Sequence, residues 1–151
     1  MPLAWLKENT AKARASLTAE VSKYKNKQFM EAVIAGCALM AAADGNVSAD
    51  EKKKMMGYIQ QSEELKHFDQ GEMMASFQKI VTGFEFDMDL GKAEALKVIG
   101  RLKGKDEQAR ILVRVVCAIG ASDGDFDADE QALASQISRE LGLDPKDFDL
   151  A

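Results

Sequence analysis

The sequence predicts an all-α fold, a single compact domain of seven or eight helices around a pseudo-twofold, duplicated helix–loop–helix core. Only two prolines occur among the 151 residues, whereas eight residues are methionine, and this composition favours long uninterrupted helices. Apolar residues recur at helical spacing through most of the chain, and no stretch shows the sustained alternation of a strand. An acidic loop that occurs twice between helical segments predicts the duplication.

Capping residues and glycines predict where the helices begin and end. Asp-Gly pairs at positions 44 and 123 end helices because glycine readily adopts the left-handed backbone conformation. Ser48 and Asp127 each precede a glutamate by three residues, which is the capping-box pattern, and Asp69 gives a weaker start signal. The expected helices span residues 29–43, 48–61, 69–84, 90–102, 107–122 and 127–141, with a link over 85–89 and one last turn from Pro145. The helix over 29–43 is rich in small residues, which allow close approach of neighbours, so we expect it at the centre of the fold.

The charge is distributed unevenly between the first residues and the rest of the chain. Residues 1–29 contain six basic and two acidic residues, although the whole chain carries a net charge of -5. We therefore expect residues 1–25 to form a basic amphipathic or partly disordered segment, and residues 26–151 to form the helical domain. A sparse apolar stripe (Leu3, Leu6, Leu17, Val21) and the positive charge suit weak, salt-sensitive contact with a membrane surface. A solvated tail is the alternative, and the acidic body argues against nucleic acid as a partner.

No arrangement of residues typical of an enzyme is present in the sequence. His67 is the only histidine and has no cysteine nearby, so neither a zinc site nor a nucleophile–base pair can be built around it. Cys37 and Cys117 lie in apolar helical stretches and are expected to be buried, reduced thiols. No apolar run approaches the roughly 20 residues of a membrane span, and the N-terminus lacks a signal-peptide pattern, so the expected location is cytoplasmic.

The repeated loop is the most informative feature of the sequence. Residues 42–51 (AADGNVSADE) align without gaps on residues 121–130 (ASDGDFDADE), and six of the ten positions are identical. In both copies an alanine-rich apolar helix precedes the loop and a new helix follows it. The chain therefore looks like two copies of one helix–loop–helix unit, 79 residues apart.

Both loops are rich in side-chain oxygen atoms, which hard divalent cations such as Ca²⁺ prefer. The second loop has aspartate at every second position from 123 to 129, followed by Glu130, whereas the first loop carries fewer charges and should bind a cation more weakly. The spacing is not that of an EF-hand, because Ala128 and Ala134 stand where that motif requires glycine and a bidentate glutamate. Ordinary helix capping by the same residues explains the pattern about as well.

Several segments resemble the tellurite-resistance TerB family. They are the paired loops together with residues 25–30 (KNKQFM), 84–92 (FEFDMDLGK) and 141–145 (LGLDP) with Phe148. The resemblance covers the chain from about Ser22 to the end, so residues 26–151 are identified as a TerB-like helical domain. It implies divalent-cation binding and a role in resistance to tellurite and other stresses such as phage and colicins. It also implies action beside partners, namely the membrane protein TerC and calcium-binding TerD-like proteins, on the cytoplasmic side of the inner membrane.

The resemblance and the residues together favour a non-enzymatic, divalent-cation-binding adaptor, with Ca²⁺ as the expected cation. The residues that the resemblance places on the acidic surface, and that we expect to bind metal, are Asp44, Glu51, Asp123, Asp125, Asp127 and Glu130, with Asp87 and Asp89 as weaker candidates. A metal-independent interaction module that uses the same acidic face is the alternative. A metal-dependent hydrolase is a third hypothesis, disfavoured because no basic substrate-binding cluster accompanies the carboxylates.

Overall fold

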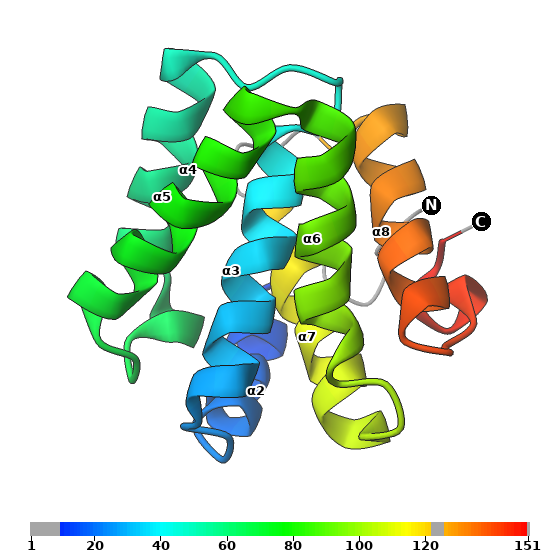
Figure 1. Cartoon of the computed structure of the whole chain (residues 1–151). Helices are drawn as coiled ribbons and strands as arrows, with labels where there is room; N and C mark the ends of the chain where they lie inside the picture. Colours follow the sequence, from blue (N-terminus) through cyan, green and yellow to red (C-terminus); the bar gives the residue numbers. More distant parts are fainter. Residues whose placement is uncertain (1–9, 122–125, 151) are drawn as a thin grey trace.

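The computed structural model describes residues 10–121 and 126–150, and within these ranges the chain forms seven α-helices, two short 3-10 helices and no strand (Figure 1). The predicted all-α class is therefore confirmed. The α-helices are α2 (Thr10–Val21), α3 (Lys27–Ala41), α4 (Ala49–Gln61), α5 (Gln70–Phe86), α6 (Met88–Gly100), α7 (Asp106–Gly120) and α8 (Ala128–Glu140). The 3-10 helices are η1 (Glu63–Leu65) and η2 (Pro145–Phe148).

Helix α3 lies at the centre of the molecule, as its small residues predict. Every residue from Ala32 to Ala41 is buried, so the helix has no solvent-facing side over this stretch. It contacts α4, α5, α6, α7 and α8 (Figure 1). The crossing with α7 depends on Gly36, because a Cβ atom there would lie 2.5 Å from Cγ2 of Val116. Small side chains thus let α7 pack directly against the central helix.

The helix ends follow the predicted signals closely at the two loops. Ser48 and Asp127 are the N-caps of α4 and α8, and each forms a complete capping box with the glutamate three residues later. Helix α3 ends at Ala41, two residues before the predicted end, and Gly45 follows with a φ angle of +89°. The helix begins at Lys27, two residues before the predicted start. Asn26 caps it by accepting a hydrogen bond from the Phe29 amide at 2.8 Å.

The predicted link over residues 85–89 is wrong. Helix α5 continues to Phe86 and α6 begins at Met88, so that only Asp87 lies between them. The side chain of Asp87 accepts a hydrogen bond from the Leu90 amide at 3.0 Å and caps α6. The turn is tight because Gly91 packs against the backbone at the end of α5: a Cβ atom on Gly91 would lie 2.8 Å from the carbonyl carbon of Gly83.

The two helix–loop–helix units have the same dimensions. Helices α3 and α7 each have 15 residues, α4 and α8 each have 13, and seven residues connect the helices of each pair. The duplication of the unit and the pseudo-twofold relation between its copies both stay predictions.

The N-terminal segment is part of the packed structure from α2 onward. Leu17 is 3% exposed and Val21 is fully buried, and α2 contacts both η1 and α7. These two side chains therefore do not belong to a membrane-facing stripe; Leu3 and Leu6 lie outside the described residues. None of the helices in the described ranges combines the length and the apolar character needed to cross a membrane.

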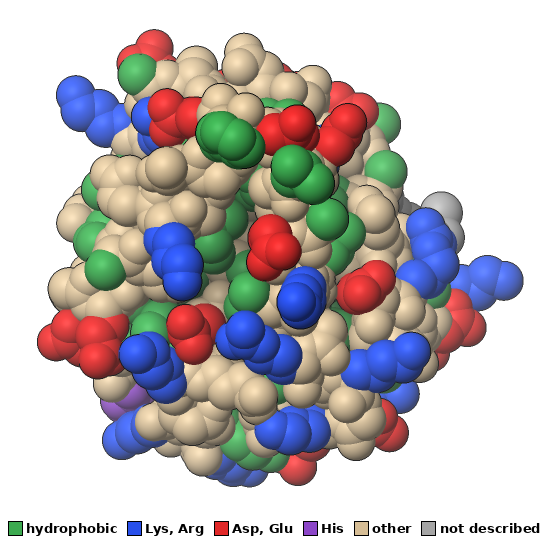
Figure 2. All heavy atoms as spheres, in the orientation of Figure 1, with side chains coloured by type: hydrophobic (Ala, Val, Ile, Leu, Met, Phe, Trp, Pro, Cys, Tyr) green, Lys and Arg blue, Asp and Glu red, His purple; other side chains and the backbone are tan. Residues whose placement is uncertain are grey.

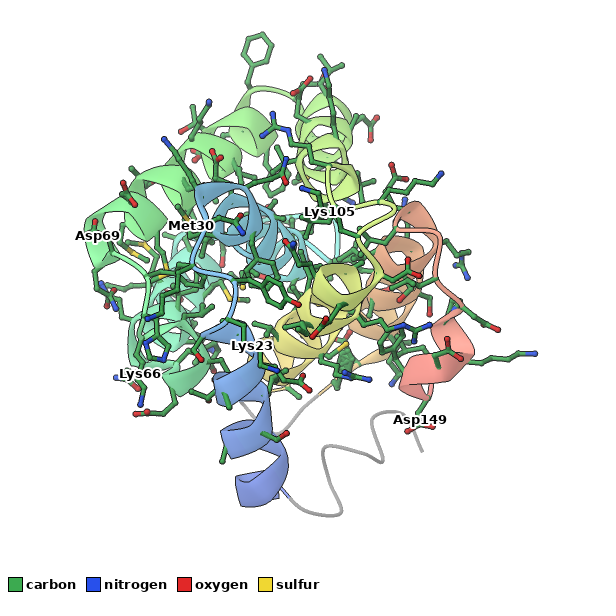
Figure 3. All side chains as sticks on the ribbon, turned by 90° about the horizontal axis from the view of Figure 1, so that it is seen from below. Lys23, Met30, Lys66, Asp69, Lys105 and Asp149 are labelled. Atoms are coloured by element: carbon green, nitrogen blue, oxygen red, sulfur yellow. The ribbon has the colours of Figure 1, made fainter. Side chains whose placement is uncertain are left out.

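The lower end of the molecule carries several lysines and is seen from below in Figure 3. Lys23 and Lys66 project there from the end of α2 and from the residue after η1. Lys105 lies at the same end and donates a hydrogen bond from Nζ to Oε1 of Gln28 at 2.6 Å, joining the starts of α7 and α3. The first acidic loop, between α3 and α4, and the start of α8 lie at the opposite end, at the top of Figure 1.

Candidate functional site

Residues of the two loops meet at one open pocket of about 240 Å³. Asp44 and Glu51 line it from the first unit, and Asp127 and Glu130 line it from the second. The fold thus brings together four of the six predicted site residues, although the loops are 79 residues apart in the sequence. The other two, Asp123 and Asp125, lie outside the described residues. The complete lining comprises Met40, Ala41, Ala43, Asp44, Glu51, Lys54, Met55, Tyr58, Gly120, Asp127 and Glu130.

The two glutamates also fix the starts of the helices behind the pocket. Oε1 of Glu51 accepts a hydrogen bond from the Ser48 amide at 3.0 Å, and Ser48 Oγ accepts one from the Glu51 amide at 3.1 Å. The second unit repeats the arrangement between Asp127 and Glu130, with distances of 3.2 and 2.8 Å. The capping interpretation of these residues is therefore confirmed. Capping and ligand binding are compatible, because a carboxylate has two oxygen atoms and several lone pairs.

Asp44 is held less firmly than the glutamates. Its Oδ1 accepts a hydrogen bond from the Asn46 amide at 3.1 Å, within an exposed turn. This local bond stabilises the turn after α3, and Asp44 remains exposed while it lines the pocket. Asp50 and Asp129 follow the N-caps in the first turns of α4 and α8, where the helix macrodipole favours negative charge.

Seven of the eleven lining residues were not predicted as site residues, and the four with the largest side chains are Met40, Lys54, Met55 and Tyr58. A signal for three of them existed, because Lys54, Met55 and Tyr58 follow Glu51 by three, four and seven residues and so share its face of α4. Lys54 places one ammonium group among four carboxylates and offsets part of their mutual repulsion. The thioethers of Met40 and Met55 add apolar, polarisable surface to the lining.

The wall contributed by the second unit depends on a glycine. A Cβ atom on Gly120 would lie 3.4 Å from Sδ of Met40 and 3.7 Å from Oε2 of Glu130. The absence of a side chain at Gly120 thus lets the thioether of the first unit and the carboxylate of the second approach each other.

The carboxylates that the structure describes do not converge into a ready-made coordination sphere. Within residues 10–121 and 126–150, no three acidic, histidine or cysteine side chains lie close enough together to hold a metal ion. The pocket is an open cavity whose described lining includes four acidic residues and one lysine, so its net charge is negative. It can attract a cation or a basic group by its charge.

The two thiols and the single histidine take no part in this site. Cys37 and Cys117 are free and buried, as predicted, and burial raises the pKa of each thiol to about 12. His67 is exposed between η1 and α5, as predicted for a surface residue.

Comparison with known proteins agrees with the resemblance of the loops. The family described as "Tellurite resistance protein TerB" matches residues 30–151. A curated protein from Alcaligenes sp., the "Tellurium resistance protein TerB", is 47% identical over 102 residues, which cover 68% of this chain and 84% of that protein. None of the solved structures matches the chain. The family match spans both helix–loop–helix units and the relative covers two thirds of the chain, so the chain belongs to the tellurite resistance protein TerB family.

Proposed function

We propose that the protein is a non-enzymatic adaptor that binds a divalent cation, with Ca²⁺ as the expected ion, and contributes to resistance to tellurite and other stresses. The family assignment and the name of the Alcaligenes relative support the resistance role. The observation that carries the binding role is the pocket in which Asp44, Glu51, Asp127 and Glu130 of two separate loops meet. Four carboxylates and one lysine line it, and a bound cation would offset the repulsion among the carboxylates.

Binding at this pocket requires more oxygen ligands than the described carboxylates bring together. Asp123 and Asp125 belong to the same loop as Asp127 and are part of the proposed site. Ca²⁺ takes six to eight oxygen ligands in flexible geometry, so backbone carbonyls and water would complete the set. The proposed mechanism is that the cation draws the two loops together and sets the surface that a partner contacts.

The alternative is an interaction module that needs no metal. In that case the pocket and its acidic rim bind a basic segment of a partner directly, and Lys54 limits the net charge. A metal-dependent hydrolase is the third hypothesis, which a turnover assay against phosphoesters would test.

Calorimetric titration with Ca²⁺, Mg²⁺ and Mn²⁺ on chelator-treated protein separates the first two hypotheses. We expect saturable binding of Ca²⁺, with shifts in the amide NMR signals of residues 44–51 and 126–130. If no ion shifts these signals, the cation-binding proposal is wrong and the metal-independent module replaces it.

The two loops should contribute unequally to binding. The loop over 123–130 has five carboxylates and the loop over 44–51 has three. The double change Asp123→Asn/Asp127→Asn should therefore weaken Ca²⁺ binding about tenfold more than Asp44→Asn/Asp50→Asn, a difference of about 1.4 kcal/mol. Asparagine is as good an N-cap as aspartate, so α8 should keep its start.

The control for this comparison removes two charges elsewhere. Glu63→Gln/Glu72→Gln alters exposed carboxylates outside the pocket and should leave the affinity for Ca²⁺ nearly unchanged. Equal losses from the two loop variants would contradict the predicted asymmetry.

We further propose that the protein acts in a complex at the inner membrane, with the membrane protein TerC and TerD-like proteins as partners. The excess of basic residues in residues 1–29 supports weak contact with an anionic membrane surface. Each basic residue near such a surface contributes about 1 kcal/mol. Since Leu17 and Val21 are buried, these two side chains are not available for that contact.

Sedimentation with anionic vesicles at low salt tests the membrane contact. The wild-type protein should partly co-sediment and the triple variant Lys7→Gln/Lys12→Gln/Arg14→Gln should stay in the supernatant, with a blue shift of Trp5 fluorescence seen for the wild type alone. Changing charges is preferable to deleting residues 1–25, which would remove Leu17 and Val21 from the core. The matched control is Lys66→Gln/Lys97→Gln/Lys103→Gln, and equal behaviour of the two triple variants would mean that the N-terminal charges are not responsible.

A further inference from the structure

A second hollow, distinct from the acidic pocket, lies between α3, α5 and α6. It has a volume of about 340 Å³. Its walls include the apolar side chains of Ile80, Ala95 and Val98. Gly83 and Gly91 also line it, and they have no side chain to fill the hollow. Figure 2 shows this face of the molecule, with hydrophobic side chains in and above the hollow. We call this hollow the α5–α6 groove.

Two large hydrophobic side chains stand exposed at the upper rim of the groove. Phe86 is 87% exposed and Leu90 is 60% exposed, and both line the groove. They are the large hydrophobic residues that the described part of the chain leaves exposed. Single exposed hydrophobic residues are common in soluble proteins, but a neighbouring pair beside an apolar hollow is typical of an interaction site.

The charges around the groove select the kind of partner. Glu85, Asp87 and Asp89 flank Phe86 and Leu90 and are all exposed. Figure 2 shows acidic side chains beside the hydrophobic ones along the top of this face, and Lys and Arg side chains across its lower half. An acidic rim repels anionic lipid and nucleic acid and attracts basic groups.

Charged residues of both signs line the rest of the groove. Lys79 and Arg101 are the basic ones, and Glu31 and Glu94 are the acidic ones. The ion pair of Glu85 with Lys52 is 3.4 Å long and exposed, so it competes weakly with a partner's basic group. The groove therefore presents an apolar centre beside an acidic upper rim, with charged residues of both signs along the rest of its lining.

We propose that the α5–α6 groove binds an amphipathic helix of a partner protein, whose apolar side chains pack on Phe86 and Leu90 and whose Lys or Arg side chains face Glu85, Asp87 and Asp89. A helix fits better than an extended peptide, because no sheet edge exists in the described ranges to which a strand could be added. Helices that carry acidic residues in the first turn and basic ones in the last are also intrinsically stable. Such a helix would lie with its C-terminal end at the acidic rim.

This inference goes beyond the proposed function, because it involves neither the acidic pocket nor a cation. The occupant is a peptide segment with a defined pattern, so a random peptide library displayed on phage is a suitable probe. The wild-type protein is the bait, and peptides that also bind Phe86→Ser/Leu90→Ser are removed by counter-selection. Both positions are exposed, so this variant should keep the melting temperature of the wild type.

The recovered peptides should carry apolar residues at helical spacing with Lys or Arg on the flank. By calorimetry, Phe86→Ser/Leu90→Ser should weaken their binding at least about tenfold. Glu85→Gln/Asp89→Asn should weaken it less and should reduce its dependence on salt; Asp87 is left intact because it caps α6. A chelator should have no effect, which distinguishes this site from the acidic pocket.

The matched control is Ala75→Ser/Ala132→Ser, which changes two exposed apolar positions away from the groove and should leave binding unchanged. The proposal is overturned if the library yields no peptide that distinguishes wild type from Phe86→Ser/Leu90→Ser, or if the recovered peptides lack basic residues. It is also overturned if the wild-type protein self-associates in sedimentation equilibrium and the double serine variant does not. In that case a second copy of the chain occupies the groove.

Discussion

The native thiols of Cys37 and Cys117 are expected to react with a thiol reagent at pH 8 at least about a thousandfold more slowly than the same thiols in denaturant. Both side chains are fully buried, and desolvation raises the pKa of each from 9.0 to about 12. At pH 8 only about one thiol in ten thousand is then ionised, against roughly a tenth or more in the unfolded chain. The measurement is absorbance from an aromatic disulfide reagent, with and without guanidinium chloride.

The same shift predicts how stability depends on pH. The pKa of each thiol is higher in the folded state, so its contribution is fully present below the unfolded value and is lost as the pH rises from about 9 toward 12. The free energy of unfolding should therefore fall above pH 9, and Cys37→Ala/Cys117→Ala should flatten that fall while lowering stability at pH 7. Fast labelling of the native protein, or lost tellurite resistance in a variant that stays folded, would favour a redox role for the thiols.

The second large effect is expected from Gly91→Ala, which should lower the free energy of unfolding by about 3 kcal/mol. A Cβ atom there would lie 2.6 Å from Cδ1 of Phe84 and 2.7 Å from the Phe84 backbone nitrogen. The side chain of Phe84 could adopt another rotamer, but its backbone nitrogen can move away only if α5 and α6 separate. The melting temperature should fall by roughly 6–12 °C.

Gly57→Ala is the matched control, because Gly57 also lies inside a helix and a Cβ atom there meets nothing within 4 Å. Alanine is the better helix former, so this change should raise stability by up to about 1 kcal/mol. Thermal and urea unfolding, followed by circular dichroism, measure both variants. A Gly91→Ala protein as stable as the wild type would mean that the close contact of α5 and α6 is unimportant for stability.

Local signals were sufficient to predict α4 and α8, because Ser48 and Asp127 cap their helices through residues only three positions away. The turn at Asp87 could not be predicted in the same way. It depends on the contact of Gly91 with the end of α5, which exists only once the two helices have packed. The start of α3 is predictable from the sequence, since Asn26 is a good N-cap and accepts a hydrogen bond from the amide of Phe29, three residues later.

The candidate site shows the same division between local and tertiary information. The loop residues were found because the two loops repeat each other, but the sequence does not say that both loops line one pocket. Lys54 and Tyr58 could have been added from their spacing to Glu51 on α4. Met40 could not, because it reaches the pocket from the end of α3 and lies beside Gly120 of the other unit.

The shared use of Glu51 and Glu130 links helix stability to whatever occupies the pocket. Each carboxylate already holds the first turn of its helix in place, so its rotamer is fixed before any ligand arrives and little side-chain entropy is lost on binding. A ligand that pulled either carboxylate away would instead uncap α4 or α8, at a cost of about 1 kcal/mol. The coupling is reciprocal. If a ligand that uncaps α4 or α8 changes the affinity for a partner that frays the same helix start, that partner changes the affinity for the ligand by the same factor. The two capping boxes thus allow a contact on α4 or α8 to regulate occupancy of the pocket without touching the ligand.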